Sequence, residues 1–341
     1  MNLIIGLLII AVGAFCQSSS YVPINKIKKW SWESYWIIQG VFAWLVFPLV
    51  GSLLSLSGTG GSFSDLLGMM NANPKDTWLT ILFGVLWGVG GLTFGLSMRY
   101  LGVALGQSIA LGTCSGLGAI LGPVFTGKTG DLTSAVIIGV VVTLIGIAII
   151  GVAGWMKSAA LPEEQKKEAV KDFNFGKGLF VAVLAGFMSA CFNIGLSFGD
   201  GLYLEGTKPI FQTLPATMLV TFGGFLTNAC YCFFQNSKNK TWGDYKQGSL
   251  WGNNLLFCCL AGLLWYSQFF GLSLGKGFLT DYPVLITFSW CILMALNVVF
   301  SNVWGIILKE WKGVSRKTIV VLVCGLAVLI FSTFLPQLLA Q

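Results

Sequence analysis

The chain has 341 residues, of which 55% are hydrophobic and only 10% are charged, and its mean hydropathy is +0.80. A soluble domain carries about 25% charged residues, so this composition excludes a water-soluble globular protein and predicts one embedded in a lipid bilayer. The net charge of +7 does not indicate a nucleic-acid partner, because the basic residues lie in short segments between apolar runs.

Apolar segments of the length that a bilayer requires, about 20 residues, predict an all-α integral membrane protein with ten transmembrane helices. Their predicted ranges are 2–24, 34–54, 78–97, 102–124, 132–155, 177–199, 210–235, 250–272, 282–308 and 318–338.

The longest polar segment, residues 157–176, predicts a cytoplasmic linker between two halves of five helices each, residues 1–156 and 177–341. Sixteen of the twenty Lys and Arg residues lie in the odd-numbered connections, which places these connections in the cytoplasm and both termini in the periplasm. Because five is odd, the halves would have opposite orientations, as in the inverted repeats of many secondary transporters.

Sequence motifs for enzymatic chemistry are few. The chain has no histidine, and its nine cysteines form no C-x-x-C pair, so we expect no metal site, no disulfide framework and no Ser-His-Asp triad. The segment "GPVFTGKT" (Gly122–Thr129) matches the P-loop pattern, but it lies between two predicted membrane helices on the periplasmic side. We interpret it as a tight turn, and we expect neither an enzyme nor a cofactor nor ATP binding.

Neutral polar and aromatic side chains are the main chemical feature of the predicted helices. Paired amide donors and acceptors beside aromatic rings suit a neutral polyhydroxylated ligand, although a single Asn or Gln also commonly makes only an interhelical hydrogen bond. Gln268 follows Trp265 by three residues, so the two lie close on one helix surface. The predicted substrate-binding residues are Gln17, Tyr21, Gln107, Asn193, Asn228, Asn254, Trp265, Tyr266 and Gln268.

Four segments carry a family resemblance. They are "YVPINKIKKWSWESYW" (Tyr21–Trp36), "FGVLWGVGGLTFGLSMRYLG" (Phe83–Gly102), "GLLWYSQFF" (Gly262–Phe270) and "LKEW" (Leu308–Trp311). Together they resemble the bacterial L-rhamnose–proton symporter family of the drug/metabolite transporter superfamily, over nearly the whole chain. The resemblance implies two inverted five-helix repeats and import of a 6-deoxyhexose across the inner membrane with a proton. Gly91, Thr93 and Phe94 depart from the family pattern, so if they line the site, a related 6-deoxyhexose is the alternative to L-rhamnose as the substrate.

Proton coupling requires a buried ionisable group. Without histidine the carrier must be a carboxylate, and the candidates are Asp281, Glu33 and Asp200, with Na+ as the alternative coupling ion. The expected partners are therefore a neutral 6-deoxy sugar, a coupling cation and the lipid bilayer. The alternative function is an exporter or exchanger of another small neutral metabolite with the same fold.

Overall fold

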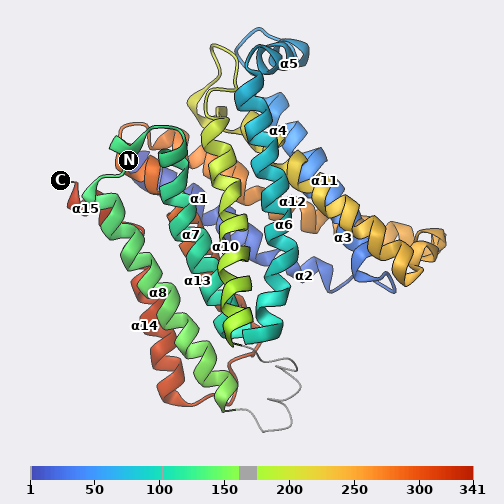
Figure 1. Cartoon of the computed structure of the whole chain (residues 1–341), viewed down its shortest axis with the longest axis vertical. Coiled ribbons are helices and arrows are strands. Elements are labelled where there is room, and N and C mark those ends of the chain that lie inside the picture. The colour runs from blue at the N-terminus through green and yellow to red at the C-terminus, as the bar shows by residue number, and fades with distance from the viewer. Residues whose placement is uncertain (1, 102, 161–174, 341) are drawn as a thin grey trace. The chain divides into compact units, whose positions relative to one another are not determined.

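The computed structural model describes residues 2–101, 103–160 and 175–340, and all regular elements in these ranges are helical (Figure 1). The elements are α1 (Asn2–Ser19), α2 (Tyr21–Ile24), α3 (Trp32–Gly40), the π-helix η1 (Val41–Val46), α4 (Phe47–Ser55), α5 (Phe63–Ala72), α6 (Pro74–Leu101), α7 (Val103–Phe125), η2 (Thr129–Asp131), α8 (Ser134–Ala159), α10 (Phe175–Phe198), η3 (Pro209–Phe211), α11 (Leu214–Asn239), η4 (Thr241–Lys246), α12 (Gly248–Phe278), α13 (Pro283–Ile307), α14 (Arg316–Ser332) and α15 (Leu335–Leu339).

Nine helical segments in the described ranges are long and apolar enough to cross a membrane. The tenth predicted segment, 318–338, forms the 17-residue helix α14 and the short helix α15. The chain is therefore a multi-pass membrane protein. Most of the predicted linker, residues 157–176, lies outside the described residues.

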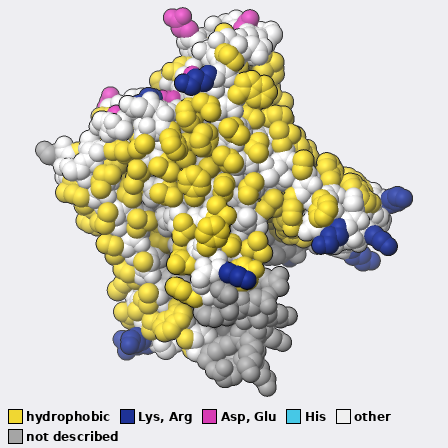
Figure 2. Space-filling view, in the orientation of Figure 1, with side chains coloured by type: hydrophobic (Ala, Val, Ile, Leu, Met, Phe, Trp, Pro, Cys, Tyr) yellow, Lys and Arg dark blue, Asp and Glu magenta, His cyan; other side chains and the backbone are white. Residues whose placement is uncertain are grey.

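Hydrophobic side chains dominate the surface. Figure 2 shows them covering the long helices, with charged side chains near helix ends and connections. Large apolar residues such as Leu8, Val12 and Phe180 are exposed by 59%, 62% and 69%. Exposure of this kind is expected where a helix faces lipid rather than water.

The chain divides into two compact units, each assembled from discontinuous segments. The first unit comprises Met1–Gly88 and Gly195–Thr280, and the second comprises Val89–Ile194 and Asp281–Gln341. Each unit thus takes helices from both predicted five-helix halves. The halves are stretches of sequence, and a repeat relation between them stays a prediction.

Close helix contacts in the first unit depend on glycine. A Cβ atom added at Gly13 of α1 would lie 2.8 Å from the carbonyl oxygen of Ser267 in α12. In α6, a Cβ at Gly84 would collide with the backbone carbonyl of Val220 in α11. Since no hydrophobic effect drives helix association inside a bilayer, this close backbone packing is a main source of stability there.

The core of the second unit lies among α8, α13 and α14. Its buried members include Ile147 and Ile150 from α8, Ala295 from α13, and Leu322 and Leu329 from α14. These branched and small side chains fill the space between the three helices.

Candidate functional site

The membrane span Trp32–Ser55 is interrupted near its centre by the π-helical turn η1 (Val41–Val46). At its end the N–H of Phe47 donates to the carbonyl oxygen of Phe42, five residues back. Gly40 precedes the turn, and a Cβ there would lie 2.6 Å from the ring of Trp44. The glycine therefore leaves room for the Trp44 indole. Single π-turns are rare and frequently occur at functional sites.

Trp44 belongs to an aromatic group of the first unit that we call the tryptophan cluster. Its ring centroids lie 6.0 Å from those of Trp87, 5.9 Å from Trp265 and 5.7 Å from Trp36. Trp87 and Trp265 are 5.7 Å apart, and Phe269 lies 5.2 Å from Trp265. The cluster thus joins η1 to α3, α6 and α12.

The depth of the cluster in the membrane is unusual for tryptophan. Trp44, Trp87 and Trp265 each lie within about two residues of the midpoint of the spans Trp32–Ser55, Pro74–Met98 and Gly248–Phe278. Membrane tryptophans are normally enriched at the two water interfaces. Trp87 and Trp265 also keep part of their surface exposed, whereas Trp44 is buried. Aromatic faces at mid-depth can pack against the C–H surface of a ligand.

Among the described residues of the first unit, four buried polar atoms have no hydrogen-bond partner in the protein, and three of these four are in α3, η1 and α12. These three are the Gln39 Oε1, the Trp44 Nε1 and the Tyr266 hydroxyl, on side chains exposed by 2%, 3% and 4%. A buried polar group without a partner is destabilising and therefore rare in native structures, so each one requires an explanation. Trp30 Nε1 has the same property, but it lies beside Tyr245 and Trp251 at the loop end of α3.

Four of the predicted site residues lie at or beside the tryptophan cluster. Trp265 is a member, and Gln268 donates from Nε2 to the Trp265 carbonyl oxygen at 3.1 Å. Asn228 of α11 accepts from Trp36 Nε1 at 3.0 Å and therefore supports the cluster. Tyr266 follows Trp265, and a Cβ added at Gly51 of α4 would collide with its hydroxyl oxygen.

The other predicted residues lie apart from the cluster or in the second unit. Asn254 accepts from the Lys28 N–H at 3.0 Å and donates to the Lys28 carbonyl at 2.9 Å, so it fixes the loop after α2. Gln17 accepts from the Ser18 hydroxyl at 3.5 Å, and Tyr21 is exposed. In the second unit, Asn193 donates to the Gly118 carbonyl at 2.8 Å, and Gln107 is half-buried in α7.

Of the three coupling candidates, Glu33 alone is buried, whereas Asp200 and Asp281 are exposed. The Glu33 Oε1 accepts from Asn239 Nδ2 at 3.0 Å and from the Thr241 hydroxyl at 2.8 Å. These two bonds attach the start of α3 to the end of α11 and to η4.

A second carboxylate, Asp244 of η4, lies in the same polar region and was missed by the sequence predictions. Its Oδ2 accepts from the N–H and the hydroxyl of Ser31, both at 2.8 Å. Partial burial works against ionisation of Asp244, but the hydrogen bonds from Ser31 outweigh it and hold the pKa of Asp244 below its ordinary value.

Sequence reasoning also missed Gln39, Trp44 and Trp87. A signal for the two tryptophans was present, because both stand near the centres of the predicted helices 34–54 and 78–97 rather than at their ends. No comparable signal marked Gln39, whose importance depends on the π-turn that follows it.

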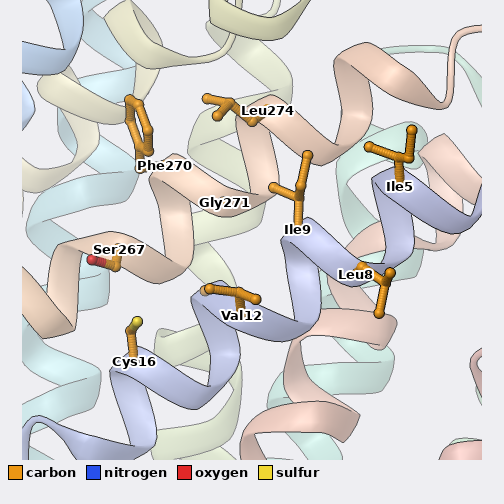
Figure 3. Close-up of a pocket in the computed structure, with 10 residues that line it drawn as sticks. Ile5, Leu8, Ile9, Val12, Cys16, Ser267, Phe270, Gly271 and Leu274 are labelled. Atoms are coloured by element: carbon orange, nitrogen blue, oxygen red, sulfur yellow. The ribbon is translucent and has the colours of Figure 1, made fainter. Parts of the chain in front are cut away.

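An apolar cavity of about 410 Å³ lies between α1 and α12 (Figure 3). Its lining is mostly aliphatic and aromatic carbon, from residues such as Ile9, Val12, Phe270 and Leu274. Ser267 supplies the one hydroxyl drawn in the close-up. This cavity offers a polyhydroxylated ligand few hydrogen bonds, so the tryptophan cluster is the better candidate site.

Comparison with known proteins identifies the family. The family model described as L-rhamnose-proton symport protein matches residues 1–338. An L-rhamnose-proton symporter of Cronobacter sakazakii is 33% identical over 340 residues, covering 95% of this chain and 94% of the relative. One of Yersinia pestis (strain Pestoides F) is 33% identical over 348 residues, covering 97% and 96%. Both relatives are named as transporters, which agrees with the prediction that this chain is not an enzyme. The chain therefore belongs to the L-rhamnose–proton symport protein family.

Proposed function

We propose that this protein imports L-rhamnose, or a related 6-deoxyhexose, across the bacterial inner membrane together with a proton. The observation that carries the proposal is the family match over residues 1–338 of a multi-pass membrane protein. The finer architecture that we propose is the ten-helix, inverted-repeat plan of the drug/metabolite transporter superfamily. In this plan α14 is the tenth span and both termini are periplasmic.

The tryptophan cluster has the chemistry that a neutral deoxy sugar requires. The partly exposed rings of Trp87 and Trp265 can cover the C–H face and methyl group of the sugar. The buried Tyr266 hydroxyl and the Gln268 amide can exchange hydrogen bonds with its hydroxyls. Among the described ring contacts of the cluster there is no Lys or Arg, which favours a neutral ligand over an anion.

Transport by alternating access would expose this mid-depth site first to the periplasm and then to the cytoplasm. For the proton we favour Glu33, because it is the buried member of the three candidate carboxylates. Protonation of Glu33 would then change its hydrogen bonds with Asn239 and Thr241. Na+ is the alternative coupling ion, and uptake measured under separate proton and Na+ gradients distinguishes the two ions.

The test is uptake into proteoliposomes that contain the purified full-length protein. Labelled L-rhamnose should accumulate under an inward proton gradient, and a protonophore should abolish this accumulation. An inward Na+ gradient without a proton gradient should not support it. Unlabelled 6-deoxyhexoses added as competitors rank the related sugars. Transport of an unrelated metabolite without uptake of any 6-deoxyhexose would instead support an exporter or exchanger.

A further inference from the structure

We propose that the π-helical turn of the first unit supplies two sugar-binding groups, a donor at Trp44 Nε1 and an acceptor at Gln39 Oε1. The inference rests on the proposed function and adds to it two binding residues that lie on a different helix from Trp265 and Gln268. Together with the ring faces of Trp87 and Trp265, these groups would bind two hydroxyls of a 6-deoxyhexose.

The π-turn changes the helix register between Gln39 and Trp44. In a regular α-helix, side chains five residues apart are rotated by about 140° relative to each other, so Gln39 and Trp44 would face different sides. The π-turn closes hydrogen bonds between residues five apart, as Phe47 and Phe42 show. The extra residue brings positions five apart closer to one face. The interruption therefore explains how the Gln39 amide and the Trp44 indole can serve one site.

Polar groups close to Trp44 find hydrogen-bond partners within the protein. Trp36 Nε1 donates to Asn228 Oδ1, and Gln268 Nε2 donates to the Trp265 carbonyl oxygen. Acceptors are therefore available around the cluster. Trp44 Nε1 nevertheless has no acceptor and Gln39 Oε1 has no donor, although both side chains are less than 4% exposed. Buried groups that stay unsatisfied beside satisfied ones are expected where a ligand completes the hydrogen bonds.

The indole donor and the amide acceptor complement the hydroxyl groups of a sugar. A sugar hydroxyl can accept from an indole N–H and donate to an amide oxygen, so one donor and one acceptor match a pair of hydroxyls. The aromatic rings around Trp44 match the apolar C–H surface between those hydroxyls. The turn also lies near the centre of its membrane span, where secondary transporters bind substrate beside irregular helix backbone.

The test compares L-rhamnose binding to the purified full-length protein and its variants by isothermal titration calorimetry. Trp44→Phe keeps an aromatic ring and removes the N–H, while Gln39→Met keeps the side-chain length and removes the acceptor. Each should raise the Kd for L-rhamnose roughly three- to tenfold, the effect of one hydrogen bond. Trp30→Phe removes another buried, unpartnered indole N–H away from the cluster, so this matched control should change the Kd less than about twofold.

A series of L-rhamnose analogues, each lacking one hydroxyl, distinguishes direct contact from a structural effect. The analogue that lacks the partner of Trp44 should bind the wild type more weakly than L-rhamnose does. Trp44→Phe should bind this analogue and L-rhamnose with the same Kd. This coupling, measured as a double-mutant cycle, arises only when the two removed groups interact.

Two outcomes would overturn the inference. If the wild type, Trp44→Phe and Gln39→Met all bind L-rhamnose with the same Kd, Trp44 Nε1 and Gln39 Oε1 do not contact the sugar, and the proposed function still stands. If the wild type binds no 6-deoxyhexose at all, the proposed function fails together with this inference. Thermal unfolding of each variant shows whether it is folded, and because the two substitutions are on different side chains, either folded variant suffices.

Discussion

Two buried indoles, Trp44 in the first unit and Trp290 in the second, occupy similar surroundings but differ in their hydrogen bonds. Each is 3% exposed, and each contacts another aromatic ring. Trp290 Nε1 donates to the Cys114 carbonyl oxygen of α7 at 3.2 Å, whereas Trp44 Nε1 has no protein partner. A membrane helix bundle can therefore satisfy a buried indole. The missing partner of Trp44 is a local property of the tryptophan cluster, which supports a binding role.

Glycine makes room for the indole in both regions, but the consequences differ. A Cβ at Gly118 would collide with the indole nitrogen of Trp290, so this glycine lets α7 approach closely enough for a backbone carbonyl to accept. Gly40 makes room for the six-membered ring of Trp44, but no carbonyl of a neighbouring helix accepts from its N–H. The close helix contact at Trp290 therefore serves packing, whereas the tryptophan cluster keeps an unpartnered donor at Trp44.

The largest expected effect comes from Glu33, the buried carboxylate of the first unit. Glu33→Gln keeps an oxygen that can accept from Asn239 and Thr241 but removes the titratable proton. We predict complete loss of concentrative L-rhamnose uptake under a proton gradient, while exchange of labelled for unlabelled sugar at equal concentrations continues. Proteoliposome transport assays measure both.

The matched control is Asp281→Asn in the second unit, since Asp281 is exposed. It should leave concentrative uptake close to that of the wild type. Normal accumulation by Glu33→Gln, or its loss in Asp281→Asn, would assign the proton to a different residue.

The second prediction concerns Gly118→Ala, which should disturb packing without touching the sugar site. The added methyl group meets the Trp290 indole, and overpacking a tight contact costs roughly 1–3 kcal/mol. We therefore expect a lower unfolding temperature and an unchanged Kd for L-rhamnose. Gly130→Ala is the control, because a Cβ there meets nothing within 4 Å. If Gly118→Ala raises the Kd for L-rhamnose and Gly130→Ala leaves it unchanged, the Trp290 region also contributes to binding.

Hydropathy predicted most of the membrane helices, because a bilayer requires long apolar segments whatever their packing. The segment 34–54 corresponds to α3, η1 and α4 together, and 78–97 lies inside α6. The π-turn within the former could not be predicted, since inserting one residue into a helix leaves the hydropathy profile unchanged. Helix α5 was missed for a different reason. It has only ten residues, and it begins with a capping box at Ser62 and Asp65 in a connection rather than in a span.

The candidate site was predicted in part, and for a clear physical reason. Trp265, Tyr266 and Gln268 are adjacent in sequence on one helix, so their proximity required no knowledge of the fold. Gln39 and Trp87 join them only through packing of α3 and α6 against α11 and α12, which one sequence does not specify. Asn254 was predicted as a sugar-binding residue, but the fold uses its amide to hydrogen-bond the backbone of Lys28, a residue 226 positions away.

The smallest expected effect concerns Asp244, which stabilises the loop end of the first unit. Hydrogen bonds from Ser31 hold the pKa of Asp244 below the ordinary value of 3.8. A depressed pKa means that the folded state favours the carboxylate, so its contribution to stability is present above pH 3.8 and is lost as the pH falls through the lower folded value. Asp244→Asn should therefore flatten this acid-dependent part of the unfolding temperature measured from pH 6 to pH 3. The difference should stay below about 1 kcal/mol because the side chain is only half-buried and solvent screens it. If the wild type and Asp244→Asn lose stability in parallel over this range, the acid sensitivity resides in other carboxylates. The stability contributed by the Ser31–Asp244 hydrogen bonds then does not depend on the charge of Asp244.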